Sequence, residues 1–447
     1  MRRRALAVAT AILSTAILST AILSAAAPAA ATPGPQNAPE YWFDSWHVPQ
    51  LWQSGADGHG VVIAEVDTGV NAGLPELKGR ILPGIDYGGG GNGQVDRQIN
   101  SFGHGTAMAS IMVARPGLLG IEGLAPAAKI IPVAVPLTGT ADAAGNDHLA
   151  DAIRWSADHG AKVISMSLGG TRLPDRDTIP CPEDEQQAIY YALAKGDVLL
   201  AASGNGGAGS SAVEEPGVCL GVVSVGAVDA TGTVASFSSR HPYLTMSAPG
   251  VNIPSLGREA GTAYSGDGTS QATALASAAV ALVWSKYPHL TGQQVVTRVL
   301  ATLDAHTTDA HTTDAHTTRQ NPAYGYGTLD AYRAVTESVP ADATNPVFTA
   351  VAAFLLRFRA FARASAAPAP NPADTAHPSV GVFRVGASPR LLAPRVLDGL
   401  YLAAAGLLAL VALAAWALIG RHRRRAPVMF EAAPDRPSDS YTWQQIE

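Results

Sequence analysis

Residues 268–287 read GTSQATALASAAVALVWSKY, a small polar tripeptide followed by an apolar run. The run from 272 to 287 is rich in Ala, Leu and Val, which predicts a buried helix. A serine at the start of such a helix lies among backbone N–H groups at the positive end of the helix dipole. Negative charge on a substrate oxygen would be stabilised there. Gly268-Thr269-Ser270 alone also fits an ordinary helix cap. Other residues of the chain are needed to distinguish a cap from a catalytic serine.

Apolar runs that predict buried strands precede this segment, at 61–66, 129–135, 163–168, 198–202 and 220–228. Helical patterns lie among them, at 104–113, 147–159 and 184–195. This alternation predicts an α/β fold with a mostly parallel sheet between helices. In such a sheet, functional groups gather in the loops beyond the carboxyl ends of the strands.

Three residue types fall at such loop edges in a meaningful order. Asp67 closes the first strand, His104 opens a helix, and Ser270 opens the later one. A serine hydroxyl needs a base to take its proton, and an imidazole base needs a carboxylate to orient it. The order Asp, His, Ser is the subtilisin order of this arrangement. Taken singly, Asp67 fits a turn, His104 a cap or core histidine, and Asn205 a left-handed turn; together they favour catalysis.

The segments 66–70, 104–106, 202–205 and 268–270 resemble the signature blocks of subtilisin-like serine proteases, and the resemblance covers about residues 57–335. It implies the three-layer subtilisin-like fold. It also implies a site made of the triad Asp67, His104 and Ser270, the oxyanion donor Asn205, and the substrate-pairing edge Ser167-Leu168-Gly169. One departure is Ala274, which stands where the family has proline. Because proline suits a first helical turn, we expect alanine to loosen the helix start slightly.

Both ends of the chain carry membrane-related patterns. Arginines at 2–4 precede a long apolar stretch that ends in small residues, which predicts a signal peptide at 1–31. The uncharged apolar stretch 400–419 is followed by a basic cluster, which predicts a transmembrane helix at 400–420 and a cytoplasmic tail at 421–447. An uncleaved anchor and a buried core helix are the respective alternatives. The protease domain would then lie outside the cell membrane.

Between these ends the composition indicates three consecutive parts. Residues 32–57 carry three tryptophans and are expected to pack on the protease domain, which we place at 58–339. Within it, 304–318 repeats Asp-Ala-His-Thr-Thr, and the five-residue spacing favours a solvated loop over a metal site. Residues 340–399 are an Ala/Pro-rich linker, in which 347–364 fits an interfacial amphipathic helix or a helical spacer.

Composition excludes several functions and predicts one covalent link. Hydrophobic residues make up 47% and charged residues 15%, which supports a large core, and the net charge of −6 gives no footprint for nucleic acid. No phosphate-binding loop motif is present. Cys181 and Cys219 are the only cysteines and predict a disulfide in an exported domain, with two free thiols as the alternative. We expect no metal or other cofactor.

The whole layout resembles the mycosins, membrane-anchored proteases of actinobacterial type VII secretion systems. The resemblance implies a serine endopeptidase that acts on protein or peptide substrates and also steadies the secretion membrane complex. It implies that the extension is not a removable inhibitory propeptide, although this chain lacks the second cysteine pair that mycosins often carry. The alternative is a structural component of that complex with a vestigial protease site.

Overall fold

The computed structural model describes residues 40–98, 102–137, 148–172, 181–210, 213–305, 320–340 and 342–366. The strands are β1 (Val62–Asp67), β2 (Ile85–Asp86), β3 (Lys129–Ala134), β4 (Val163–Met166), β5 (Gly170–Arg172), β6 (Val198–Ala202), β7 (Val213–Glu215), β8 (Val222–Val228), β9 (Met246–Pro249), β10 (Ile253–Leu256) and β11 (Ala263–Gly266). The helices are α1 (Trp42–Ser45), α2 (Val48–Gln53), η1 (Pro75–Leu77), α3 (His104–Val113), α4 (Leu149–Asp158), α5 (Glu183–Lys195), α6 (Thr269–Lys286), α7 (Gly292–Ala301), α8 (Ala331–Thr336) and α9 (Pro346–Ala366).

Seven of these strands form one parallel sheet in the order β2-β3-β1-β4-β6-β8-β9. All five predicted strands belong to it, so the expected parallel sheet is confirmed. The order places β1 in the middle, with β3 and β4 on its two sides. The pairs β5–β7 and β10–β11 are separate antiparallel ribbons.

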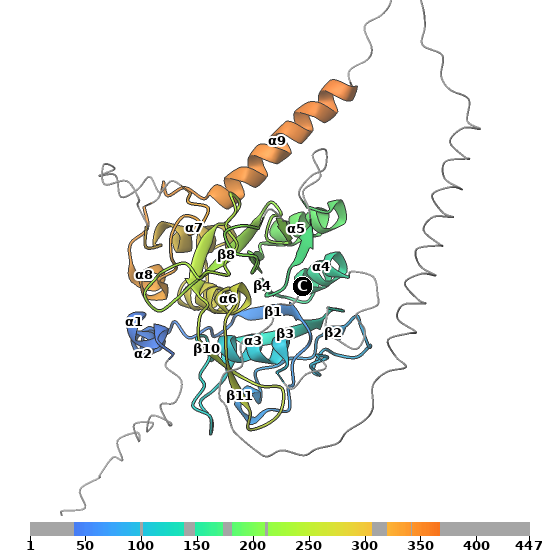
Figure 1. Ribbon diagram of the computed structural model, residues 1–447. Helices are drawn as coiled ribbons and strands as arrows, with labels where there is room; N and C mark the ends of the chain where they lie inside the picture. Colours follow the sequence, from blue (N-terminus) through green and yellow to red (C-terminus); the bar gives the residue numbers. More distant parts are fainter. Residues whose placement is uncertain are drawn as a thin grey trace, which may run out of the picture. The chain divides into compact units, whose positions relative to one another are not determined.

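Helices cover both faces of this sheet, with α3 and α6 on one face and α4 and α5 on the other (Figure 1). Successive strand residues alternate between the two cores: Ile63 packs with α3 and α6, whereas Ala64 packs with α4 and α5. Burying a side chain such as Ile63 fully is worth roughly 1.5–3 kcal/mol. Two apolar layers therefore hold the sheet, and the carboxyl ends of its strands share one edge.

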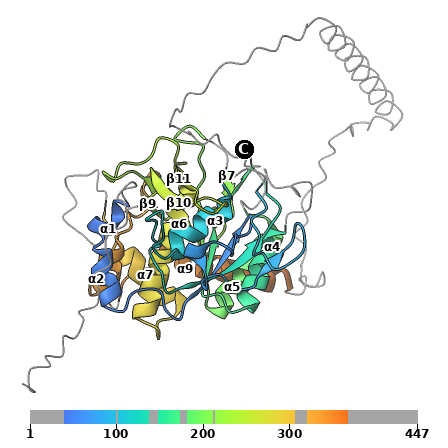
Figure 2. The ribbon, with the colours of Figure 1, turned by 90° about the horizontal axis from the view of Figure 1, so that it is seen from below.

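The extension packs on the domain, as predicted for residues 32–57, over its described part from Glu40. Trp42 is 1% exposed, and the Trp52 indole nitrogen donates to the Leu124 carbonyl at 2.9 Å. Figure 2 shows α1 and α2 at the edge of the domain that also carries α7, away from α4 and α5. Tyr332 of α8 contacts His47 at the start of α2, with ring centroids 4.9 Å apart.

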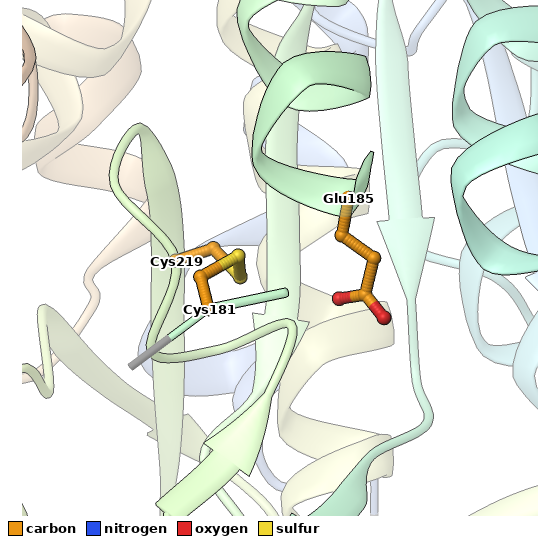
Figure 3. Close-up of side chains that lie close together, drawn as sticks. All are labelled: Cys181, Glu185 and Cys219. Carbon is orange, nitrogen blue, oxygen red and sulfur yellow. A yellow bond between two sulfur atoms is a disulfide. The ribbon is translucent and has the colours of Figure 1, made fainter. Parts of the chain in front are cut away.

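The predicted disulfide between Cys181 and Cys219 is present, and Figure 3 shows it with Glu185 of α5 nearby. Within the described ranges, these three side chains form the single group with the spacing of metal ligands. Both sulfur atoms are joined to each other, so this group does not supply thiolate ligands.

Compact packing continues beyond residue 339, where the predicted protease domain ends. Val347 and Val351 of α9 are buried, and Val347 belongs to the core under α6. The first part of the predicted linker is thus a helix that packs on the domain, because apolar residues four apart share one helical face.

Several sequence predictions fall outside the described residues. These are the signal peptide 1–31, most of the repeat loop 304–318, the later part of the linker, the transmembrane helix 400–420 and the tail. Within the described part of the chain, no helix combines the length and the apolar character needed to cross a membrane.

Candidate active site

The structure brings the predicted aspartate and histidine into direct contact. Asp67 is the last residue of β1 and His104 is the first of α3, which follows Gly103 in the left-handed conformation at φ 68°. His104 Nδ1 lies 2.8 Å from Asp67 Oδ1 and 2.9 Å from Oδ2. Side-chain exposure is 10% for His104 and 1% for Asp67. A buried carboxylate therefore fixes the imidazole with Nδ1 protonated, which leaves Nε2 as the basic nitrogen.

Opposing effects set the basicity of His104. Burial disfavours the charged imidazolium, but the negative charge and hydrogen bond of Asp67, with a smaller contribution from Asp96, outweigh it. The pKa of His104 therefore lies above its ordinary value. This direction suits a base that must hold a proton during a reaction near neutral pH.

A second buried carboxylate, Asp96, organises the loops around this pair and was missed by the sequence analysis. Its oxygens accept from the hydroxyls of Thr68 and Thr106 at 2.9 and 2.6 Å, and from the Thr106 and Gln98 backbone N–H groups at 2.8 and 3.1 Å. Thr68 directly follows Asp67, and Thr106 lies two residues after His104. Asp96 thus ties the end of β1 to the start of α3. Both threonines lie in the quoted motifs, but no local pattern marks Asp96 as their partner.

Glu65, two residues before Asp67 on the same face of β1, is also buried, at 1% exposure. Burial raises the pKa of Glu65 well above its ordinary value, and the charges of Asp67 and Asp96 raise it further. Ionising this carboxyl would place another negative charge in the core beside Asp67 and Asp96, so its surroundings favour the protonated form. Glu65 therefore adds a buried acid beneath the site.

Ser270 is the second residue of α6 and is half-buried. Its Oγ donates to the Ser167 carbonyl at 2.8 Å, and Ser167 Oγ donates back to the Ser270 carbonyl at 3.0 Å. Ser167 directly follows β4, so this reciprocal pair joins the edge of the sheet to the start of α6. To react through His104, the Ser270 hydroxyl must turn from the Ser167 carbonyl toward Nε2. The backbone N–H of Ser270 lies in the first helical turn, where no intrahelical acceptor exists.

Asn205 is held in place by the residue before Ser270. Its Oδ1 accepts from the backbone N–H and the hydroxyl of Thr269, both at 3.0 Å. Because a side-chain amide presents its oxygen and its NH₂ group in different directions, this fixes the NH₂ group facing away from Thr269. Gly204 before it has φ 100°, a conformation that favours glycine. The arrangement suits a fixed donor to an oxyanion beside Ser270.

The predicted substrate-pairing segment lies at the edge of the sheet, directly after β4. Ser167-Leu168-Gly169 links β4 to β5, and Leu168 is half-buried while Gly169 is exposed. Pairing of this segment with a substrate backbone stays a prediction.

The expectation for Ala274 was wrong in its location: α6 begins at Thr269, so Ala274 is its sixth residue, beyond the first turn. Alanine there keeps a backbone N–H that proline would remove.

Comparisons with known proteins identify the family. The model of the subtilase family, Peptidase_S8, matches residues 58–327. Mycosin-3 of Mycobacterium tuberculosis is 31% identical over 356 residues, which cover 66% of this chain and 71% of Mycosin-3. Fervidolysin of Fervidobacterium pennivorans is 32% identical over 277 residues, 55% of this chain but only 37% of fervidolysin, so the chain spans little more than a third of that relative.

Solved structures give the same result. The structure described as MycP3 protease from the type VII (ESX-3) secretion system matches with a TM-score of 0.57 and 30% sequence identity. The match covers 69% of this chain and 90% of that structure. It extends the similarity from sequence motifs to the arrangement of the sheet and its helices.

Proposed function

Because this chain belongs to the subtilase family, we propose that it is a serine endopeptidase that cleaves proteins or peptides through an acyl-enzyme. The single observation that carries the proposal is the buried contact between Asp67 and His104 Nδ1 at 2.8 Å. A carboxylate and an imidazole in this geometry make Nε2 a base, which a structural histidine does not need.

The reaction assigns one task to each residue. Ser270 Oγ attacks the substrate carbonyl while His104 Nε2 takes its proton, and Asp67 stabilises the imidazolium that forms. The oxygen of the tetrahedral intermediate would accept from the Asn205 NH₂ group and the Ser270 backbone N–H. His104 then gives its proton to the leaving amine, and a water molecule repeats the sequence to release the acid and restore Ser270.

We propose further that the protein is a mycosin-type protease, anchored by one membrane span with its protease domain outside. The support is the similarity to Mycosin-3 and to the MycP3 structure, whose description places that protease in a type VII secretion system. The apolar stretches at the two ends of the sequence support export and anchoring. The proposed partners are protein substrates and a secretion membrane complex.

A fluorophosphonate probe tests the catalytic assignment, because it reacts with an activated serine whatever the substrate preference. Full-length protein in detergent should be labelled, and Ser270→Ala should lose both the label and all peptide cleavage. The exposed serine Ser236 provides the control, since Ser236→Ala should label like the wild type. Labelling that persists in Ser270→Ala would remove Ser270 from the mechanism.

One observation favours the second candidate, a structural component with a vestigial site. The Ser270 hydroxyl donates to the Ser167 carbonyl rather than to His104. This candidate predicts that wild-type protein is not labelled, and that secretion survives Ser270→Ala but not deletion of the whole protein. Comparing those two strains separates the two functions.

A further inference from the structure

The proposed reaction fixes where one substrate side chain must lie. The carbonyl carbon under attack has to come within about 3–3.5 Å of Ser270 Oγ, with its oxygen near Asn205. Ser167–Gly169 borders this point, since the Ser167 carbonyl contacts Ser270 Oγ. The loop that contains Asn205 also borders it, since Asn205 contacts Thr269. We expect the residue that contributes the carbonyl to place its side chain between these two loops.

Glu214 reaches both loops at this place. A methyl group added at Gly204 would meet Glu214 Cγ at 2.3 Å and Oε1 at 2.7 Å, and one added at Gly169 would meet Oε2 at 3.2 Å. The two carboxylate oxygens thus lie against positions 169 and 204, one on each loop, where glycine leaves no side chain in the way. Glu214 itself is 7% exposed. A buried carboxylate lies beside the space that receives the substrate side chain.

The backbone holds this glutamate in a defined orientation. Glu214 is the middle residue of β7, which pairs with β5 directly after the substrate-pairing edge. Its N–H donates to the Tyr243 hydroxyl at 3.0 Å, and its carbonyl accepts from the Val218 N–H at 2.9 Å. The neighbouring Glu215 points to the opposite face of the strand, as alternation requires, and lies beside Gly170 instead.

We infer that Glu214 determines specificity, and that the substrate residue on the acyl side of the cleaved bond is arginine or lysine. This inference rests on the proposed peptidase function. A buried carboxylate has several lone-pair positions, so it can accept from a guanidinium or ammonium group in addition to its neighbours. A large apolar side chain in the same space would desolvate the carboxylate and give it no donor in return. The charge therefore favours a cation by attraction and disfavours an apolar residue by desolvation.

A matched set of fluorogenic peptides tests the inference, with Arg, Lys, Gln, Leu or Phe before the cleaved bond and Ala at the other positions. For full-length protein in detergent, we expect kcat/KM to be highest for Arg and Lys. Glu214→Gln keeps the shape and removes the charge, and should lower kcat/KM for these two peptides on the order of 30-fold or more, as for other buried charge pairs. The Gln, Leu and Phe peptides should be unaffected or improved. Glu214→Asp should retain the preference for basic residues.

Two controls separate failure of this inference from failure of the proposed function. Glu215→Gln makes the same change on the other face of β7 and should leave the peptide preference unaltered. Fluorophosphonate labelling reports an assembled site in every variant. Normal labelling with an apolar preference, or a basic preference that survives Glu214→Gln, would overturn the role of Glu214 and leave the peptidase assignment standing. Absence of labelling in the wild type would overturn both.

Discussion

The two halves of the site are built differently. The half that holds the base combines a strand end and a helix start, where hydrogen bonds donated to the carboxylates of Asp67 and Asp96 fix His104 and both threonines. The half that holds the nucleophile relies on neutral hydrogen bonds of Ser270 and Asn205 to nearby backbone and hydroxyl groups. Hydrogen bonds that involve a charged group are roughly twice as strong as neutral ones. The base is therefore positioned firmly, whereas the nucleophile must still turn to meet it.

Removing the charge of Asp67 should give the largest loss of activity and tests the half that holds the base. Asp67→Asn should lower kcat about 10⁴-fold, because an amide at this position favours the wrong tautomer of His104. The assay is steady-state cleavage of the best peptide substrate, with circular dichroism to confirm the fold.

Glu65→Gln is the matched control on the same strand face. Burial favours the protonated form of Glu65, so replacing it with a neutral group of the same shape should leave kcat near the wild-type value. A comparable loss in both variants would mean that buried polarity in β1, and not the charge that orients His104, explains the effect.

Substitutions in the half that holds the nucleophile should lower the activity less. Asn205→Ala removes the proposed oxyanion donor and should lower kcat about 10²–10³-fold, the range seen for this residue type in a subtilisin. KM should change little, since the donor acts mainly in the transition state. Thr269→Val keeps one of the two hydrogen bonds to Asn205 Oδ1, so its effect should be smaller. If Thr269→Val costs as much as Asn205→Ala, orientation of the amide is the dominant factor.

The sequence identified the catalytic candidates of both halves but not the residues that connect them. Asp67, His104 and Ser270 could be placed because each lies at the end or start of an apolar run, and Asn205 because it follows one. The partners that connect them, such as Asp96 and Glu214, could not, because a loop residue and a short-strand residue carry no periodic signal. Their roles depend on contacts between segments far apart in the chain, from Asp96 to Thr68 and from Glu214 to Gly169. The helix expected for 347–364 is present as α9, but the burial of Val347 in the folded core carried no such local signal.

Asp96 gives the smallest expected effect, and the pH dependence of activity makes it a specific test of the half that holds the base. The activity requires neutral His104, so kcat/KM falls on the acid side as pH drops through the pKa of His104. Burial lowers this pKa, while Asp67 and Asp96 raise it, and the net shift is upward. Asp96→Asn removes one of these negative charges, so the acid limb should move to lower pH, with a smaller loss at the plateau than Asn205→Ala causes. The control is Asp86→Asn, which alters another buried carboxylate, one that pairs with Arg97. An acid limb that stays in place in Asp96→Asn, or moves equally in Asp86→Asn, would show that Asp96 holds the loops together without acting on the base.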